Sequence, residues 1–227
     1  MNPVYFQIIY PHLKWLRARR DEVSDQNDRM GANAGIVLFS AIFLEGFLED
    51  ALTTFAPHYS NGLGEKAKTL VNIERTSSLD GYKTLFESFG FELYSFLSSV
   101  DQEDLDFIFS FRNLLAHGQR DSYLILHDGD WMPKEIVGSF YQGIEKFLVK
   151  RRVLQTKASV QPLHSELFSD PVADWVYSRT MEISEEILGK LKTLVDMTRI
   201  VQQSNLDRIS RFLDAVDKPL RKPPSLS

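Results

Sequence analysis

The sequence predicts an all-α protein: a helical bundle with a long C-terminal helical extension. Apolar residues recur at helical spacing through most of the chain. Several of these segments begin or end at residues typical of helix termini. Only one short segment, residues 123–130, combines an apolar run with the strong turn signal Asp-Gly, and it can form a small β-hairpin. We see no internal repeat.

Composition limits the classes of function. With 227 residues, 43% hydrophobic and 25% charged, the chain can form one large domain or two small ones with an ordinary core. The net charge of −5 means that a nucleic-acid site must be a local basic patch. The absence of cysteine excludes disulfides, thiolate zinc sites and a cysteine nucleophile, and fits a reducing compartment.

The most apolar run, residues 34–44, is too short to span a bilayer and continues directly into Glu45. It also lies too deep in the chain, and lacks the basic flank, for a signal peptide. We therefore expect a cytoplasmic protein with no membrane contact.

The N-terminal half begins with a predicted helix at residues 4–20, which Pro11 should kink or split, followed by a loop at residues 21–31. Residues 32–55 form the strongest predicted helix, apolar nearly all round and therefore central. Glu45 interrupts its apolar surface. This carboxylate is either solvated at the rim or orients a cation, for which Arg112 is the obvious candidate.

Shorter elements follow a turn-rich loop at residues 57–64. Helices are predicted at residues 65–73 and 79–89, with a helical turn or two at 91–97. The helix with the clearest start and end signals covers residues 101–118. Its first turn is acidic with Asp101 as N-cap, and Gly118 suits the position after its last turn.

The C-terminal third continues as helix. Residues 139–155 form a predicted helix with the densest positive charge in the chain, and residues 161–169 form a linker. Ser169, Asp170 and Pro171 then start a long apolar stripe that packs either on its own bundle or against a second copy, with a break near residues 204–205. We divide the chain into three parts: a bundle at 1–158, a helical extension at 159–217 and a disordered tail at 218–227.

Several common enzyme sites have no sequence signature here. The five histidines are scattered without metal-ligand spacing, and there is no Glu-x-x-His pair, Walker loop or Gly-x-Ser-x-Gly motif. The sequence therefore predicts neither a metal nor another cofactor.

The end of the 101–118 helix carries the most distinctive chemistry. Arg112, Asn113 and His117 place a guanidinium, an amide and an imidazole within two turns. An imidazole can take a proton from a hydroxyl, and a guanidinium can hold phosphate oxygens, which are the needs of metal-independent RNA cleavage. Arg112 and His117 should, however, lie about 140° apart around the helix axis unless the last turn is loosened. In the alternative interpretation, both cations only complement the helix dipole.

The phrase FRNLLAHG, residues 111–118, resembles the signature of the HEPN superfamily, in which an arginine and a polar residue precede a histidine. HEPN proteins are all-helical bundles that act mainly as metal-independent RNases in toxin–antitoxin, abortive-infection and CRISPR-linked systems. The resemblance implies that Arg112, Asn113 and His117 are catalytic. Glu45 is similar to an acidic residue of an earlier family helix and would support them. It also implies a homodimer in which two motifs meet across a cleft.

One departure from the family concerns Gln119, where the branch paired with nucleotidyltransferase antitoxins has a tyrosine that the antitoxin modifies. We expect a HEPN-type endoribonuclease that cleaves RNA by 2′-OH attack at a dimer-interface site. Its expected role is that of a toxin or phage-defence effector, with an antitoxin or regulatory protein as partner. RNA would approach along the basic residues Lys146, Lys150, Arg151 and Arg152. The alternative is a non-catalytic HEPN-like interaction or scaffold module.

Overall fold

The computed structural model describes residues 4–59, 72–73, 76, 78–88, 92–117, 124–127, 130–133, 135–155 and 166–194. Its fold is all-α, as predicted. The elements in chain order are α1 (Val4–Glu22), α2 (Gln26–Tyr59), α4 (Leu79–Ser88), the 3-10 helix η1 (Leu93–Phe96), α5 (Ser99–His117), β1 (Leu124–His127), β2 (Asp130–Pro133), α6 (Glu135–Lys150) and α8 (Asp170–Leu194).

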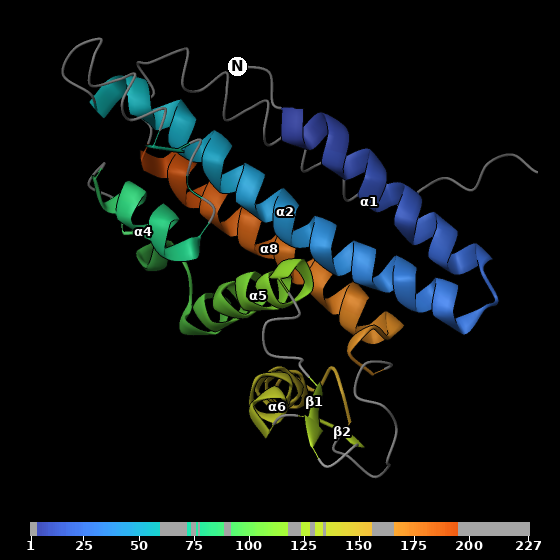
Figure 1. Ribbon diagram of the computed structural model, residues 1–227. Helices are drawn as coiled ribbons and strands as arrows, with labels where there is room; N and C mark the ends of the chain where they lie inside the picture. Colours follow the sequence, from blue (N-terminus) through green and yellow to red (C-terminus); the bar gives the residue numbers. More distant parts are fainter. Residues whose placement is uncertain are drawn as a thin grey trace, which may run out of the picture.

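Helix α2 lies at the centre of the bundle, as its apolar surface predicts. It packs against α1 on one side and against α8 and α5 on the others (Figure 1). Residues around most of its circumference are buried, including Ile36, Phe43 and Phe47. Helix α1 lies close to α2 at Gly35, where a Cβ would be 3.0 Å from Cδ1 of Leu16 and would require that side chain to shift. Such an all-round apolar helix is buried on every side when it occupies a core.

The connection between α1 and α2 is shorter than predicted. The prediction of a loop over residues 21–31 is wrong, because α2 already begins at Gln26. The carboxylate of Asp25 accepts hydrogen bonds from the backbone N–H groups of Asn27 and Asp28, at 2.9 and 3.0 Å, and so caps the helix. Helix α1 also continues through Pro11 without splitting.

Helix α5 begins two residues earlier than predicted. Asp101 is its third residue and not its N-cap, so this part of the prediction is wrong. The cap is Ser98, whose Oγ accepts a hydrogen bond from the Asp101 backbone N–H at 3.2 Å and donates one to the Asp101 carboxylate. Ser98 is thus the N-cap, and its hydroxyl also holds the Asp101 carboxylate in the first turn of the helix. Gly118 lies outside the described residues.

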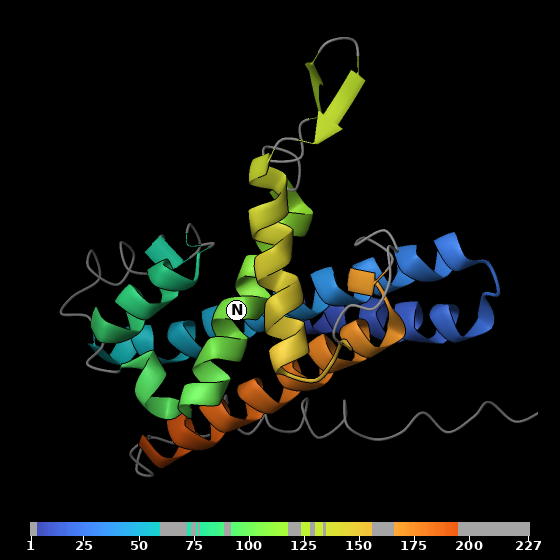
Figure 2. The same ribbon diagram turned by 90° about the horizontal axis from the view of Figure 1, so that it is seen from below.

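Helices α5 and α6 project from the layer formed by α2 and α8 (Figure 2). Helix α6 ends in a Schellman motif: the Val153 N–H donates to the Leu148 carbonyl and the Arg152 N–H donates to the Val149 carbonyl, both at 2.9 Å. Arg152 has φ of 59°, a conformation that favours glycine. Between α5 and α6, β1 and β2 form an antiparallel pair in which Leu124 lies opposite Pro133.

Helix α8 packs on the bundle of its own chain. Its apolar stripe, including Val176, Ile183 and Leu191, is fully buried in the core shared with α2 and α5. Of the two interpretations that the sequence allowed for this stripe, the structure therefore shows the first. The predicted break near residues 204–205 and the tail at 218–227 lie outside the described residues.

Among the described residues, one helical stretch, Gln26–Thr53 of α2, is long and apolar enough to cross a membrane by length and composition. The run of residues 34–44 thus belongs to a longer apolar helix than the sequence indicated. Of the window that meets this test, 61% is buried inside the bundle, as is common for the core helix of a globular protein.

Candidate active site

Arg112 is held in place from the central helix of the bundle. Its Nη2 donates to Oε2 of Glu45 on α2 at 2.6 Å, which joins α5 to α2. The side chains are only 14% and 15% exposed, so water screens the pair weakly. The carboxylate that interrupts the apolar surface of α2 is therefore not solvated at a rim; it pairs with the arginine that the sequence suggested.

Asn113 completes this arrangement on the other side of the guanidinium. The Nη1 of Arg112 donates to Oδ1 of Asn113 at 2.8 Å. Glu45 and Asn113 together engage two of the five N–H donors that a guanidinium carries. Asn113 is exposed, so this side of the arrangement lies at the protein surface.

The charge of Glu45 is set by two opposing effects. Burial raises its pKa above the ordinary value of 4.5, and the nearby Arg112 guanidinium acts in the opposite direction without cancelling the effect of burial. The ionised carboxylate is thus less favourable here than in water, and Arg112 provides the compensating charge.

His117 is the last residue of α5, and its side chain lies outside the described part of the structure. The backbone is α-helical up to this residue, so the loosened last turn that would bring it toward Arg112 is not seen. Regular helix geometry places positions 112 and 117 about 140° apart around the axis. The backbone alone does not bring the two ends of the motif together within one chain.

Two of the basic residues at the end of α6 lie beside carboxylates of α5. The Nζ of Lys150 lies 2.7 Å from Oε2 of Glu103, and the Nε of Arg151 lies 2.6 Å from Oδ1 of Asp104. Both cations are therefore opposed by carboxylates of α5. Lys146 and Arg152 are exposed.

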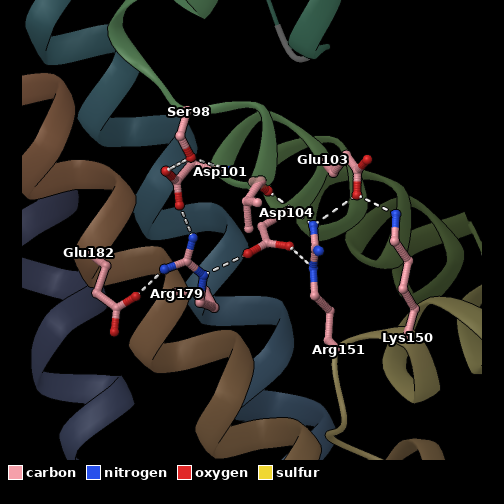
Figure 3. Close-up of polar contacts among 9 residues, drawn as sticks. Ser98, Asp101, Glu103, Asp104, Lys150, Arg151, Arg179 and Glu182 are labelled. Carbon is pink, nitrogen blue, oxygen red and sulfur yellow. Dashed lines mark hydrogen bonds and ion pairs between the residues drawn. The ribbon is translucent and has the colours of Figure 1, made fainter.

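A buried charge network that the sequence did not predict joins α5, α6 and α8. Asp104 has a side chain only 2% exposed and accepts from the Nε of Arg151 at 2.6 Å and from the Nε of Arg179 at 2.7 Å (Figure 3). Arg179 also pairs with Asp101 and Glu182. The sequence offered one indication of this network, namely that Asp104 stands beside apolar residues of α5. A carboxylate buried at such a position needs a cationic partner.

The arginine of this site is a group that phosphate chemistry can use. Within the described ranges, no three histidine or acidic side chains come close enough to hold a metal ion. The fixed guanidinium of Arg112 can bind two oxygens of a phosphate. A matching proton acceptor would have to come from His117, in this chain or in a second copy.

The comparisons with known proteins add no relative. No protein-family model matches the sequence, and neither a curated protein nor a solved structure matches it.

Proposed function

We propose that this protein is a HEPN-like, metal-independent endoribonuclease. The observation that carries the proposal is the state of Arg112: a largely buried guanidinium at the end of α5, held at 2.6 Å by Glu45 and at 2.8 Å by Asn113. These are three of the four residues that the FRNLLAHG resemblance assigns to the site. A fixed guanidinium that needs no rearrangement is well suited to stabilise charge that develops in a transition state.

In the proposed reaction, the neutral imidazole of His117 takes the proton of a ribose 2′-OH, and the 2′-oxygen attacks the adjacent phosphorus. Arg112 stabilises the additional negative charge on the phosphate oxygens, and Asn113 holds the guanidinium in position. The bond from phosphorus to the 5′-oxygen then breaks. The leaving oxygen takes a proton from a general acid, and the products are a 2′,3′-cyclic phosphate and a 5′-hydroxyl.

A homodimer is part of this proposal. Positions 112 and 117 point to different sides of α5, so one chain does not place both groups on one phosphate. A two-fold arrangement in which α5 helices of two copies meet would let Arg112 of one copy work with an imidazole of the other. We propose a cytoplasmic toxin or phage-defence effector, restrained by an antitoxin or another regulatory protein.

The test is RNA cleavage in the presence of EDTA, with Arg112→Ala and His117→Ala compared with wild type. We expect either substitution to lower the rate by about 10²- to 10⁴-fold, the usual contribution of a positioned proton acceptor or charge stabiliser. Arg19→Ala removes an arginine that is 53% exposed on α1 and serves as the matched control with an unchanged rate. Equal cleavage, or equal absence of cleavage, by all four proteins would reject the proposal.

A second candidate function is a non-catalytic interaction module. The same ion pair favours it, because an arginine already bound to Glu45 can simply tie α5 to α2. In that case Arg112→Ala lowers stability, and neither variant changes any RNA product. Expression in cells separates the two functions: growth arrest by wild type but not by His117→Ala supports the nuclease.

A further inference from the structure

A groove with a volume of about 430 Å³ lies between α5 and α6. Its lining includes Asp106, Phe107 and Ser110 from α5, and Gly143 and Phe147 from α6. The rings of Phe107 and Phe147 stack with their centroids 4.2 Å apart and make an aromatic floor. The exposed Asp106 and Ser110 provide polar groups at the rim.

The groove lies on the same side of α5 as part of the candidate active site. Positions 106, 110, 113 and 117 are separated by four, three and four residues, which is the spacing of one helix face. From Ser110 to His117 the helix rises about 10 Å and returns to within about 20° of the same direction. A chain that occupies the groove can therefore continue along α5 toward Asn113 and the end of the helix.

The carboxylate of Asp106 is held in a defined position at the rim. It accepts a hydrogen bond from the Tyr94 hydroxyl, and Nζ of Lys83 lies 3.3 Å from its Oδ1. The side chain is still 51% exposed, so it can accept a further hydrogen bond from a ligand. Lys83 offsets the negative charge that would otherwise repel a phosphate.

We propose that the groove binds one unpaired nucleobase of the RNA substrate and selects bases that carry an exocyclic amino group, an inference that rests on the proposed nuclease function. The volume suits a single nucleoside. Phe107 and Arg151 cover the flat faces of the Phe147 ring, so the floor offers a base an apolar contact through its ring edges. Asp106 accepts a hydrogen bond from the amino group of cytosine or adenine, as carboxylates do when they read cytosine. Uracil presents a carbonyl oxygen where cytosine carries its amino group, so this hydrogen bond is lost and only its ring N3–H is left to donate.

The chain contains its own reporter for this site. The ring of Trp175 lies 5.6 Å from that of Phe107 and 6.0 Å from that of Phe147, directly behind the floor. A protein with Trp15→Phe, Trp131→Phe and His117→Ala would carry Trp175 as its sole tryptophan and would not cleave RNA. Its fluorescence is then titrated with CMP, AMP and UMP.

We expect saturable fluorescence changes with CMP and AMP, and binding of UMP about tenfold weaker. Asp106→Asn should remove this preference, because an amide can either donate or accept. A Cβ built on Gly143 meets no atom within 4 Å, so Gly143→Leu should fill the groove and abolish binding, whereas Gly143→Ala should keep it. Both glycine variants are checked for folding by thermal unfolding.

Two results would overturn the proposal: no nucleotide changes the fluorescence, or folded Gly143→Leu binds as well as its parent. Equal binding of CMP and UMP would overturn the selectivity. Because these titrations use a variant that lacks His117, they do not depend on catalysis. If wild type cleaves RNA but no nucleotide binds in the groove, only the proposal of base binding is refuted. If nucleotides bind but wild type does not cleave RNA, only the nuclease proposal is refuted.

Discussion

Glu45 of α2 and Arg112 of α5 form an ion pair of 2.6 Å across the centre of the bundle, although 67 positions separate them in the chain. The pair joins the central helix to the helix that carries the candidate motif. It therefore connects the stability of the bundle with the geometry of the proposed site. This connection can be measured through the ionisation of Glu45.

The first prediction concerns pH. Because burial raises the pKa of Glu45 above 4.5, the folded chain holds this proton more tightly than the unfolded chain. The contribution to stability is thus present at low pH and is lost as pH rises from 4.5 through the raised value. In urea unfolding, the free energy of unfolding of wild type should fall across this range relative to that of Glu45→Gln. Parallel curves would contradict the prediction, and Glu87→Gln, at an exposed position of α4, is the control.

The second prediction concerns Asp104. Asp104→Ala leaves two largely buried guanidinium groups, those of Arg151 and Arg179, without their shared carboxylate. We expect a loss of about 3 kcal/mol in the free energy of unfolding, typical of removing one partner from a buried ion pair. Glu103→Ala, which removes a neighbouring carboxylate that is 49% exposed, should have a much smaller effect. Similar losses in the two variants would show that burial of Asp104 has no energetic role.

Local patterns predicted the helices well, and long-range partners poorly. The α5 stripe was visible because its apolar spacing is a property of one segment, and the Glu45 partner could be inferred because a charge on an apolar helix needs a cation. Arg179 lies 75 positions after Asp104, and only the packing of α8 determines that they meet. The charge density around Lys150 along the chain likewise does not show the acids of α5 that lie beside it in space.

The third prediction concerns the end of α6. Arg152 has φ of 59° at the position after the helix where glycine is most common. Replacing it with glycine removes the steric cost of a side chain there, about 1–2 kcal/mol, and adds flexibility to the unfolded chain that offsets part of this gain. Arg152→Gly should therefore stabilise the protein by up to about 1 kcal/mol in urea unfolding. Arg152→Ala, which removes the same charge but keeps a Cβ, should give no such gain.

The last prediction concerns Asp170 at the start of α8. Hydrogen bonds from Arg29, and then from Asn33, lower the pKa of Asp170 to about 2 although burial opposes them. The folded chain therefore releases this proton more readily than the unfolded chain. Its contribution to stability is fully present above the ordinary value of 3.8 and is lost as pH falls from 3.8 through about 2.

Asp170→Asn should accordingly be less stable than wild type at pH 7, and the two unfolding free energies should converge as pH falls toward 2. Denaturant unfolding followed by circular dichroism at several pH values measures this difference. Asp80→Asn, which changes a side chain that is 93% exposed on α4, is the matched control and should track wild type throughout. If the difference in the free energy of unfolding between wild type and Asp170→Asn stays constant down to pH 2, the charge of Asp170 does not stabilise the protein. The junction of α2 and α8 would then be held by packing and by the Asn33 hydrogen bond to the Phe168 carbonyl at 2.8 Å.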